Sequence, residues 1–179
     1  MRRIGIIVVC VLLGSAARAA AQEAGQAGIA MGYPTSVAVI FHVTDKVAVR
    51  PEFSFQHSTS DFDFLGNDGT QTATGISLGV SGLFYLREWD NVQTYVSPRY
   101  EWTRTTFDSD ASENESRGTG HVFTGSFGAQ YALHRRFGVF GEVGLSYRTS
   151  DTEVDGIDTN TNSSSWSTRT AVGAIFYFK

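Results

Sequence analysis

The strongest constraint on the fold of this chain is an alternation of apolar and polar side chains at period two, which is clearest near the C-terminus. In Ser165–Lys179 one face carries Val172, Ala174, Phe176 and Phe178, and the other carries Arg169, Ala171, Gly173, Ile175 and Tyr177. Successive side chains of a β-strand point to opposite faces, so this spacing predicts a half-buried strand. Six earlier segments alternate in the same way: 36–43, 47–57, 72–86, 92–107, 119–133 and 137–149. No window shows sustained helical spacing, and the chain is therefore expected to be all-β.

The connections between these segments are of two kinds, which alternate strictly. Short connections span 44–46, 87–91 and 134–136, and long ones span 58–71, 108–118 and 150–164. Short turns at one end and long loops at the other are typical of up-and-down membrane barrels. If the C-terminus, the short turns and the exported N-terminus all lie on one side, an eighth strand must come first. Ala24–Tyr33 supplies it, with a very short loop at Pro34-Thr35. The prediction is a closed antiparallel eight-stranded up-and-down β-barrel.

Two features favour a transmembrane barrel over a soluble lipocalin-like barrel, which would turn its apolar face inward. The polar face is rich in small residues, which suits a narrow interior: Ala73, Gly75, Ser77, Gly79 and Ser81. The aromatic residues of the apolar face gather near the long loops (Tyr100, Trp102, Phe123, Tyr147, Trp166) and near the short turns (Phe41, Phe84, Tyr131, Phe137, Phe178). These two sets are expected to form interfacial girdles. Pro51 and Pro98 are each expected to mark a bulge or local irregularity, because proline cannot donate to a ladder.

The N-terminus has the layout of a cleavable secretory signal peptide. Arg2 and Arg3 precede an apolar stretch at 4–13, and small residues follow at 15–21. The apolar stretch is about half of the ~20 residues that a retained membrane helix needs. Cleavage after Ala19 and cleavage after Ala21 both fit.

The expected domain organisation is a signal peptide over 1–21 and one β-barrel domain over 22–179. Cleavage would remove the single cysteine, Cys10, and with it any disulfide or cysteine metal ligand. It would also remove three arginines and lower the formal net charge from −4 to −7. This balance argues against nucleic acid as a partner, since binding nucleic acid needs a concentrated basic surface.

Charged residues lie on the predicted inward face, where ions must be paired because desolvating a lone ion costs several kcal/mol. The predicted charge network of the lumen comprises Arg50, Glu52, Arg99, Glu101, Glu142 and Arg169, with Arg148 nearer the outer rim. One interpretation is a structural salt-bridge network. The other is a polar conduit or gate whose pairs break to admit solute, although an eight-stranded barrel is narrow enough for side chains to fill.

The long loops are strongly acidic, and a solvated, mobile surface is the simplest interpretation. The alternative is divalent-cation binding, with bridging to anionic lipopolysaccharide. Asp151, Glu153 and Asp155 approach a calcium-loop pattern, but Glu stands at its third position and Asn162 where the bidentate Glu belongs. No other metal or cofactor site is predicted.

An enzymatic role would need a catalytic histidine near the outer leaflet. His57 and His121 are the candidates on the lipid-facing side, yet neither has a serine two residues further along the same face. The chain is therefore predicted not to be an enzyme, and no catalytic residue is assigned. A lipid A-modifying enzyme remains the least favoured alternative.

The mature chain resembles the family of small eight-stranded outer-membrane barrels of the OmpA and OmpX type. The stretch GYPTSVAVIFHVTDKVAVRPEF at 32–53 resembles the opening hairpin of "outer membrane protein β-barrel domain" proteins, and the closing strand resembles the last strand of such barrels. The resemblance implies a Gram-negative outer-membrane location, contact with lipid and lipopolysaccharide, and a monomer. It also implies recognition by the barrel-assembly machinery through Val172, Ala174, Phe176 and Phe178. The expected function is non-enzymatic, a structural or surface-interaction role through acidic extracellular loops, with a narrow channel for small solutes as the alternative.

Overall fold

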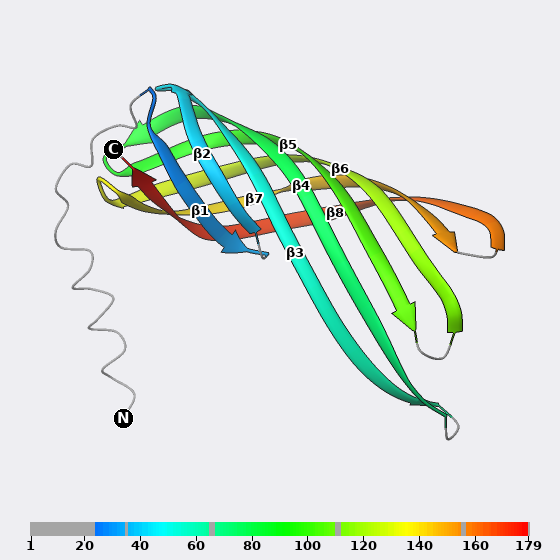
Figure 1. Cartoon of the computed structure of the whole chain (residues 1–179). Helices are drawn as coiled ribbons and strands as arrows, with labels where there is room; N and C mark the ends of the chain where they lie inside the picture. Colours follow the sequence, from blue (N-terminus) through cyan, green and yellow to red (C-terminus); the bar gives the residue numbers. More distant parts are fainter. Residues whose placement is uncertain (1–23, 35, 65–66, 110–111, 155–156, 179) are drawn as a thin grey trace, which may run out of the picture.

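The computed structural model describes residues 24–34, 36–64, 67–109, 112–154 and 157–178, with the side chains of 62–68, 109–115 and 154–160 left undescribed (Figure 1). The described chain forms eight strands: β1 (Ala27–Tyr33), β2 (Ser36–Thr44), β3 (Val47–Phe64), β4 (Asn67–Trp89), β5 (Val92–Ser109), β6 (Ser112–His134), β7 (Phe137–Val154) and β8 (Ile157–Phe178). Within the described ranges, no helix is long and apolar enough to cross a membrane.

Each strand pairs antiparallel with its neighbour in sequence, and β1 closes the sheet against β8. The stagger of the closed sheet can be followed through its Cα partners. Starting at Ala30 of β1 and crossing β2 to β7 leads to Ser165 of β8. The direct β8 partner of Ala30 is Ile175, ten residues further along. A stagger of this kind requires the strands to tilt, typically by about 35–45° from the barrel axis.

The predicted architecture is confirmed, including the eighth strand at the start of the chain and the very short connection after Tyr33. The predicted long loops are wrong. Residues within 58–71, 108–118 and 150–164 continue the ladders, and β3 pairs with β4 as far as Phe64 and Asn67.

Acidic and amide side chains are poor strand formers, so local propensity alone predicts loops in these stretches. Cross-strand hydrogen bonds compensate in the structure. Thr70 Oγ1 donates to Asp61 at 3.1 Å, and Asn162 Nδ2 donates to Asp151 Oδ1 at 2.8 Å. Such pairs between facing positions are the unit of sheet stabilisation. The acidic segments are therefore extensions of the barrel wall.

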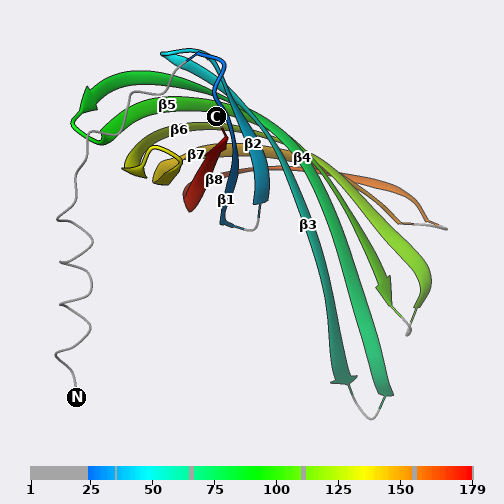
Figure 2. The ribbon, with the colours of Figure 1, turned by 60° about the vertical axis from the view of Figure 1, so that its left-hand side comes forward.

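The β1–β2 hairpin is much shorter than the other three. Strands β1 and β2 have 7 and 9 residues, against 18 to 23 for β3 to β8. In Figures 1 and 2 the long hairpins project beyond its tip, and the β3–β4 and β7–β8 hairpins fan apart. The barrel wall is therefore shortest at the β1–β2 hairpin, and we call this part of it the low side of the wall.

The predicted faces agree with side-chain exposure. On β8, Val172 is 60% exposed, whereas Ile175 and Tyr177 are buried. Rings of the outer girdle meet across strands: Tyr100 and Phe123 have centroids 5.2 Å apart, and Tyr147 and Trp166 5.0 Å. At the turn end Phe137 and Phe176 are 5.2 Å apart.

Pro51 and Pro98 do not cause bulges, since the sheet register does not shift at either. Each is, however, the site of a local irregularity, because the pairing with β2 is interrupted at Pro51 and the pairing with β4 is interrupted at Pro98. The β-bulges of the described strands lie elsewhere, near the short turns at 42–44, 85–87 and 132–134 and near the tips of two long hairpins at 107–109 and 153–154. Each proline is accommodated because the ladder on its other side is continuous, with Pro51 opposite Val80 and Pro98 opposite Gly125.

Candidate functional site

The six charged residues assigned to the lumen from the sequence come together in one connected chain of ion pairs. Arg99 contacts both Glu101 on its own strand and Glu52 on β3, the latter at 3.1 Å. Arg50 contacts Glu52 at 3.1 Å through Nε. Through Nη1 it also contacts Glu142 of β7 at 2.7 Å. Arg169 of β8 completes the chain, with Nη1 3.4 Å from the second oxygen of Glu142. Acid and base alternate along its length, and the chain crosses the lumen from β5 to β8.

Burial differs along this ion-pair chain. The side chains of Arg50, Glu52 and Glu142 are 4%, 4% and 2% exposed, whereas the terminal members Glu101 and Arg169 are 18% and 17% exposed. Buried ions require hydrogen bonds as well as partners. Glu52 also accepts a bond from the Ser81 hydroxyl, and Glu142 accepts one from Tyr95 Oη at 2.9 Å. The centre of the chain is thus buried, and within it Arg99 Nε has no hydrogen-bond partner among the described residues.

Below the ion pairs, toward the short turns, an aromatic layer fills the lumen. The rings of His42 and Tyr85 stack at 5.5 Å, and Tyr85 meets Tyr95 edge-on at 5.6 Å. Tyr177 lies 5.8 Å from His42 and accepts a hydrogen bond of 2.7 Å from Gln130. Sequence reasoning did not single out this layer as a feature. Its signal was present, because Tyr85, Tyr95 and Tyr177 occupy inward positions of three strands near the same end.

Above the ion pairs the wall is lined by small polar residues. One row of directly paired, inward-facing positions comprises Ser54, Ser77, Thr103, Gly120, Ser150 and Ser163. We call the space that this row surrounds the outer trough. Arg148 stands two residues below Ser150 on the same face of β7 and is exposed. No described residue forms an ion pair with it.

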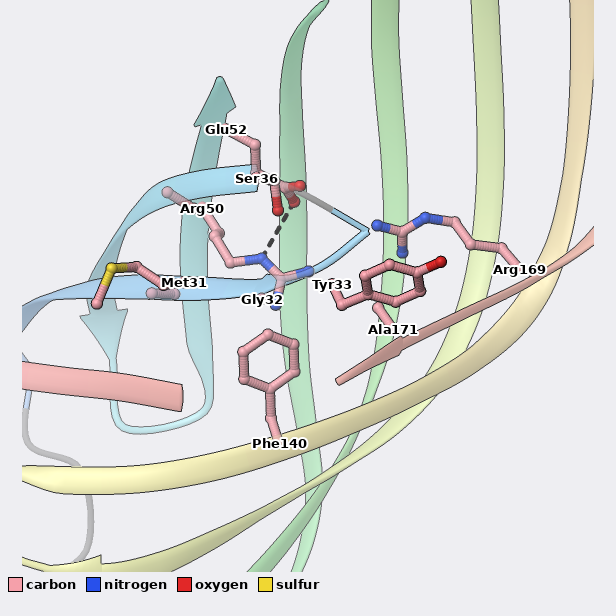
Figure 3. A pocket seen from close by; sticks show the side chains of 11 residues that line it. Met31, Gly32, Tyr33, Ser36, Arg50, Glu52, Phe140, Arg169 and Ala171 are labelled. Atoms are coloured by element: carbon pink, nitrogen blue, oxygen red, sulfur yellow. Dashed lines mark hydrogen bonds and ion pairs between the residues drawn. The ribbon is translucent and has the colours of Figure 1, made fainter. Parts of the chain in front are cut away.

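A shallow, open cavity lies beside the tip of the β1–β2 hairpin. Arg50, Glu52, Phe140 and Arg169 line its inner side, and Tyr33 lines it from the hairpin. Figure 3 shows the Arg169 guanidinium directed toward the hairpin tip, with the Tyr33 ring beside it. The cavity therefore connects one exposed end of the ion-pair chain with the low side of the wall.

The described part of the weak calcium pattern is extended strand. Asp151 and Glu153 lie on β7 opposite Asn162 and Asn160 of β8, so they are strand residues, while Asp155 lies outside the described residues. A calcium loop must wrap its ligands around one point, which an extended ladder cannot do. In the described part of the chain no group of three or more His, Cys, Asp or Glu side chains is placed to hold a metal ion.

The two candidate histidines lie on the outer surface, each paired with a hydroxyl across the ladder. His57 Nδ1 is 3.0 Å from Thr74 Oγ1, and His121 Nδ1 is 2.8 Å from Tyr100 Oη. Where side chains are described, neither ring bonds to a serine. His121 also stacks on Tyr100 at 6.0 Å, as a member of the outer aromatic girdle. The signal peptide over 1–21, with Cys10 and both cleavage positions, falls outside the described residues.

A closed antiparallel barrel with an apolar outward band between two aromatic girdles and a filled polar interior defines a class of protein. The chain has the fold of the small eight-stranded outer-membrane β-barrels and is an integral protein of the bacterial outer membrane. In barrels of this class the short turns face the periplasm and the long hairpins face outward.

Solved structures share this fold at low sequence identity. A major outer membrane protein from Thermus thermophilus is 14% identical, with a TM-score of 0.54, over 86% of this chain and 98% of that one. CarO of Acinetobacter baumannii is 14% identical with a TM-score of 0.47, over 87% and 98% of the two chains. The N-terminal β-barrel domain of Pseudomonas aeruginosa OprF is 14% identical with a TM-score of 0.48, over 88% and 100%. No protein-family model matches the sequence, and no curated protein matches it either.

Proposed function

We propose that this protein is a non-enzymatic outer-membrane barrel whose three long hairpins form an acidic platform for contacts at the cell surface. The proposal rests on the difference between the filled lumen of the barrel and its extended outer wall. Its lumen is filled by the ion-pair chain and the aromatic layer, while its wall continues well beyond the outer girdle. A filled eight-stranded lumen does not favour a constitutive channel.

The chemistry of the hairpins indicates the kind of partner. Asp61, Asp108, Asp151 and Glu153 are exposed on the described parts of the extensions. Fixed charges on a rigid sheet concentrate a potential of one sign, which steers cationic partners and weakens with salt. A basic protein surface or a lysine-rich segment is therefore the partner class that this platform fits.

The absence of catalysis is the second part of the proposal. His57 and His121 bond to threonine and tyrosine hydroxyls, which do not form the His–Ser arrangement of an acyl-transfer site. Recognition by the barrel-assembly machinery remains a proposal as well. It rests on Val172, Ala174, Phe176 and Phe178, which share the outward face of β8.

Two measurements test the platform. The first is binding of fluorescent oligolysine to the barrel in nanodiscs of zwitterionic lipid. We expect salt-sensitive binding that is lost when Asp61, Asp108, Asp151 and Glu153 are all changed to the matching amides. The control neutralises Glu88 and Asp90, two exposed acids at the turn end. Equal loss in both variants would mean that net charge, and not the platform, attracts the probe.

The second measurement is single-channel recording in planar bilayers. We expect no stable conductance steps from the unmodified protein. Reproducible steps would refute the filled-lumen reading and would favour the narrow channel instead.

A further inference from the structure

The low side of the barrel wall leaves two strand edges without a neighbour. The last Cα partners of the short hairpin are Tyr33 with Val172 on β8 and Val37 with Phe53 on β3. Beyond these pairs β3 runs on to Phe64, and β8 extends back to Ile157. The wall therefore has a lateral opening, bounded by β3, β8 and the tip of the β1–β2 hairpin.

Part of this opening lies at membrane depth. Trp166 belongs to the outer aromatic girdle and precedes Val172 by six residues on β8. Six residues of a tilted strand cover a height of about 15 Å. The edge of β8 from Trp166 to Ala171 therefore faces the outer leaflet without a neighbouring strand. An open sheet edge does not occur against lipid tails unless it lines a polar or water-filled space.

The interior behind the opening carries an uneven charge. Among the described side chains, the inward-facing charged residues around the lumen and the outer trough are four arginines and three glutamates: Arg50, Arg99, Arg148, Arg169, Glu52, Glu101 and Glu142. Arg148 has no ion-pair partner among the described residues, and Arg169 has one contact at 3.4 Å. The arginine excess in a low-dielectric wall attracts an anion.

The negative charge of the hairpins outside the membrane favours an anion that comes from the lipid over one that comes from solution. The hairpins above the trough carry exposed carboxylates, which repel small anions approaching from solution. An anionic group that is anchored in the outer leaflet avoids this barrier, because it reaches the cavity sideways, past Tyr33 and the edge of β8 (Figure 3).

We propose that the lateral opening is a binding site for an anionic membrane amphiphile. Its phosphate or carboxylate headgroup lies in the outer trough against Arg169 and Arg148, and its acyl chain stays in the lipid along the β8 edge. The hydroxyl groups of the outer trough donate further hydrogen bonds to the headgroup, in addition to the charge-assisted bonds from the arginines. This site does not depend on the acidic platform, since neither arginine belongs to it.

The experiment is native mass spectrometry of the full protein released from nanodiscs that contain phosphatidylcholine with a small fraction of dilauroyl phosphatidic acid. We expect one phosphatidic acid molecule to be retained in preference to phosphatidylcholine with the same chains. Arg148→Gln should lower the retained fraction about tenfold, the effect of one lost charge-assisted hydrogen bond. This variant removes no ion pair among the residues that the structure describes, so it should keep the gel mobility of the folded protein.

A second variant, Arg169→Gln, should have a comparable effect, and Arg169→Lys should restore part of the binding. Arg104→Gln is the matched control, because Arg104 is an exposed arginine on the outward face of β5. Equal losses in the Arg104 and Arg148 variants would overturn the trough site in favour of ordinary boundary lipid. Full competition by soluble glycerol phosphate would overturn the membrane source of the anion.

Discussion

Replacing Val172 by arginine tests the orientation of the whole barrel with a single side chain. Val172 is 60% exposed on the outward face of β8. It lies midway between the girdle residues Trp166 and Phe178, six residues from each, so it faces the centre of the apolar band. Its ladder partners, Tyr33 and Gly141, offer no carboxylate to the new guanidinium.

The expected cost follows from this depth. An arginine on the lipid face of a barrel costs about 2–4 kcal/mol at the bilayer midplane and about 0–1 kcal/mol near the interfaces. Val172→Arg should therefore destabilise the barrel by about 2–4 kcal/mol. Thr168→Arg is the matched control. It lies on the same face and strand but only two residues from Trp166, and should cost at most about 1 kcal/mol.

The assay is reversible guanidinium unfolding in phospholipid vesicles, followed by tryptophan fluorescence, with the free energy of unfolding compared between variants. A cost for Val172→Arg no larger than that for Thr168→Arg would refute the placement of the apolar band. It would also refute the outward assignment of this face.

Three further predictions concern the interior and the closure of the barrel. Glu142→Gln leaves Arg50 and Arg169 without their shared carboxylate and should lower the free energy of unfolding by about 3–5 kcal/mol in the same assay. Glu101→Gln, at an exposed end of the ion-pair chain, should lower it clearly less. Gly128→Ala places a Cβ 2.5 Å from a ring atom of Tyr95 and should cost about 1–3 kcal/mol. Gly125→Ala, with no atom within 4 Å of its Cβ, should be nearly neutral; equal effects would contradict the packing of Gly128 against that ring. The unheated protein should migrate faster on a detergent gel than the boiled protein, and identical mobilities would count against a closed barrel.

Period-two patterning was sufficient to predict the eight strands and their inward and outward faces. Side chains alternate along each strand, so the aromatic residues at the ends of a strand show which of its positions face outward. The remaining positions, such as Arg50 on β3 and Glu142 on β7, then face inward. The long loops were predicted wrongly because cross-strand pairing outweighs the low strand propensity of their acidic and amide residues. Asp61 and Asp151 looked like loop residues, yet each sits opposite a hydroxyl or amide that bonds it in the ladder.

The lateral opening was beyond the reach of sequence patterning. A short first loop at Pro34 was predicted, but its consequence depends on how far the neighbouring strands continue. That length is decided by cross-strand partners many residues away. The same holds for the order of the ion-pair chain, since partners such as Arg50 and Glu142 are brought together by the stagger of the sheet.

The charged interior has a physical role that stability alone does not explain. A buried ion pair often contributes no more to stability than apolar side chains of similar volume would. In a membrane barrel, however, the outward face is already apolar, so an apolar interior would leave the two faces of each strand nearly equivalent. A one-residue slip in register exchanges these faces. With Arg50, Glu52 and Glu142 inside, such a slip would push three ions into lipid, at a cost that far exceeds that of any mispacked apolar residue. The ion-pair chain therefore stabilises the register in which these residues face inward over the register in which they face the lipid. The geometry of the outer trough and of the lateral opening depends on this register.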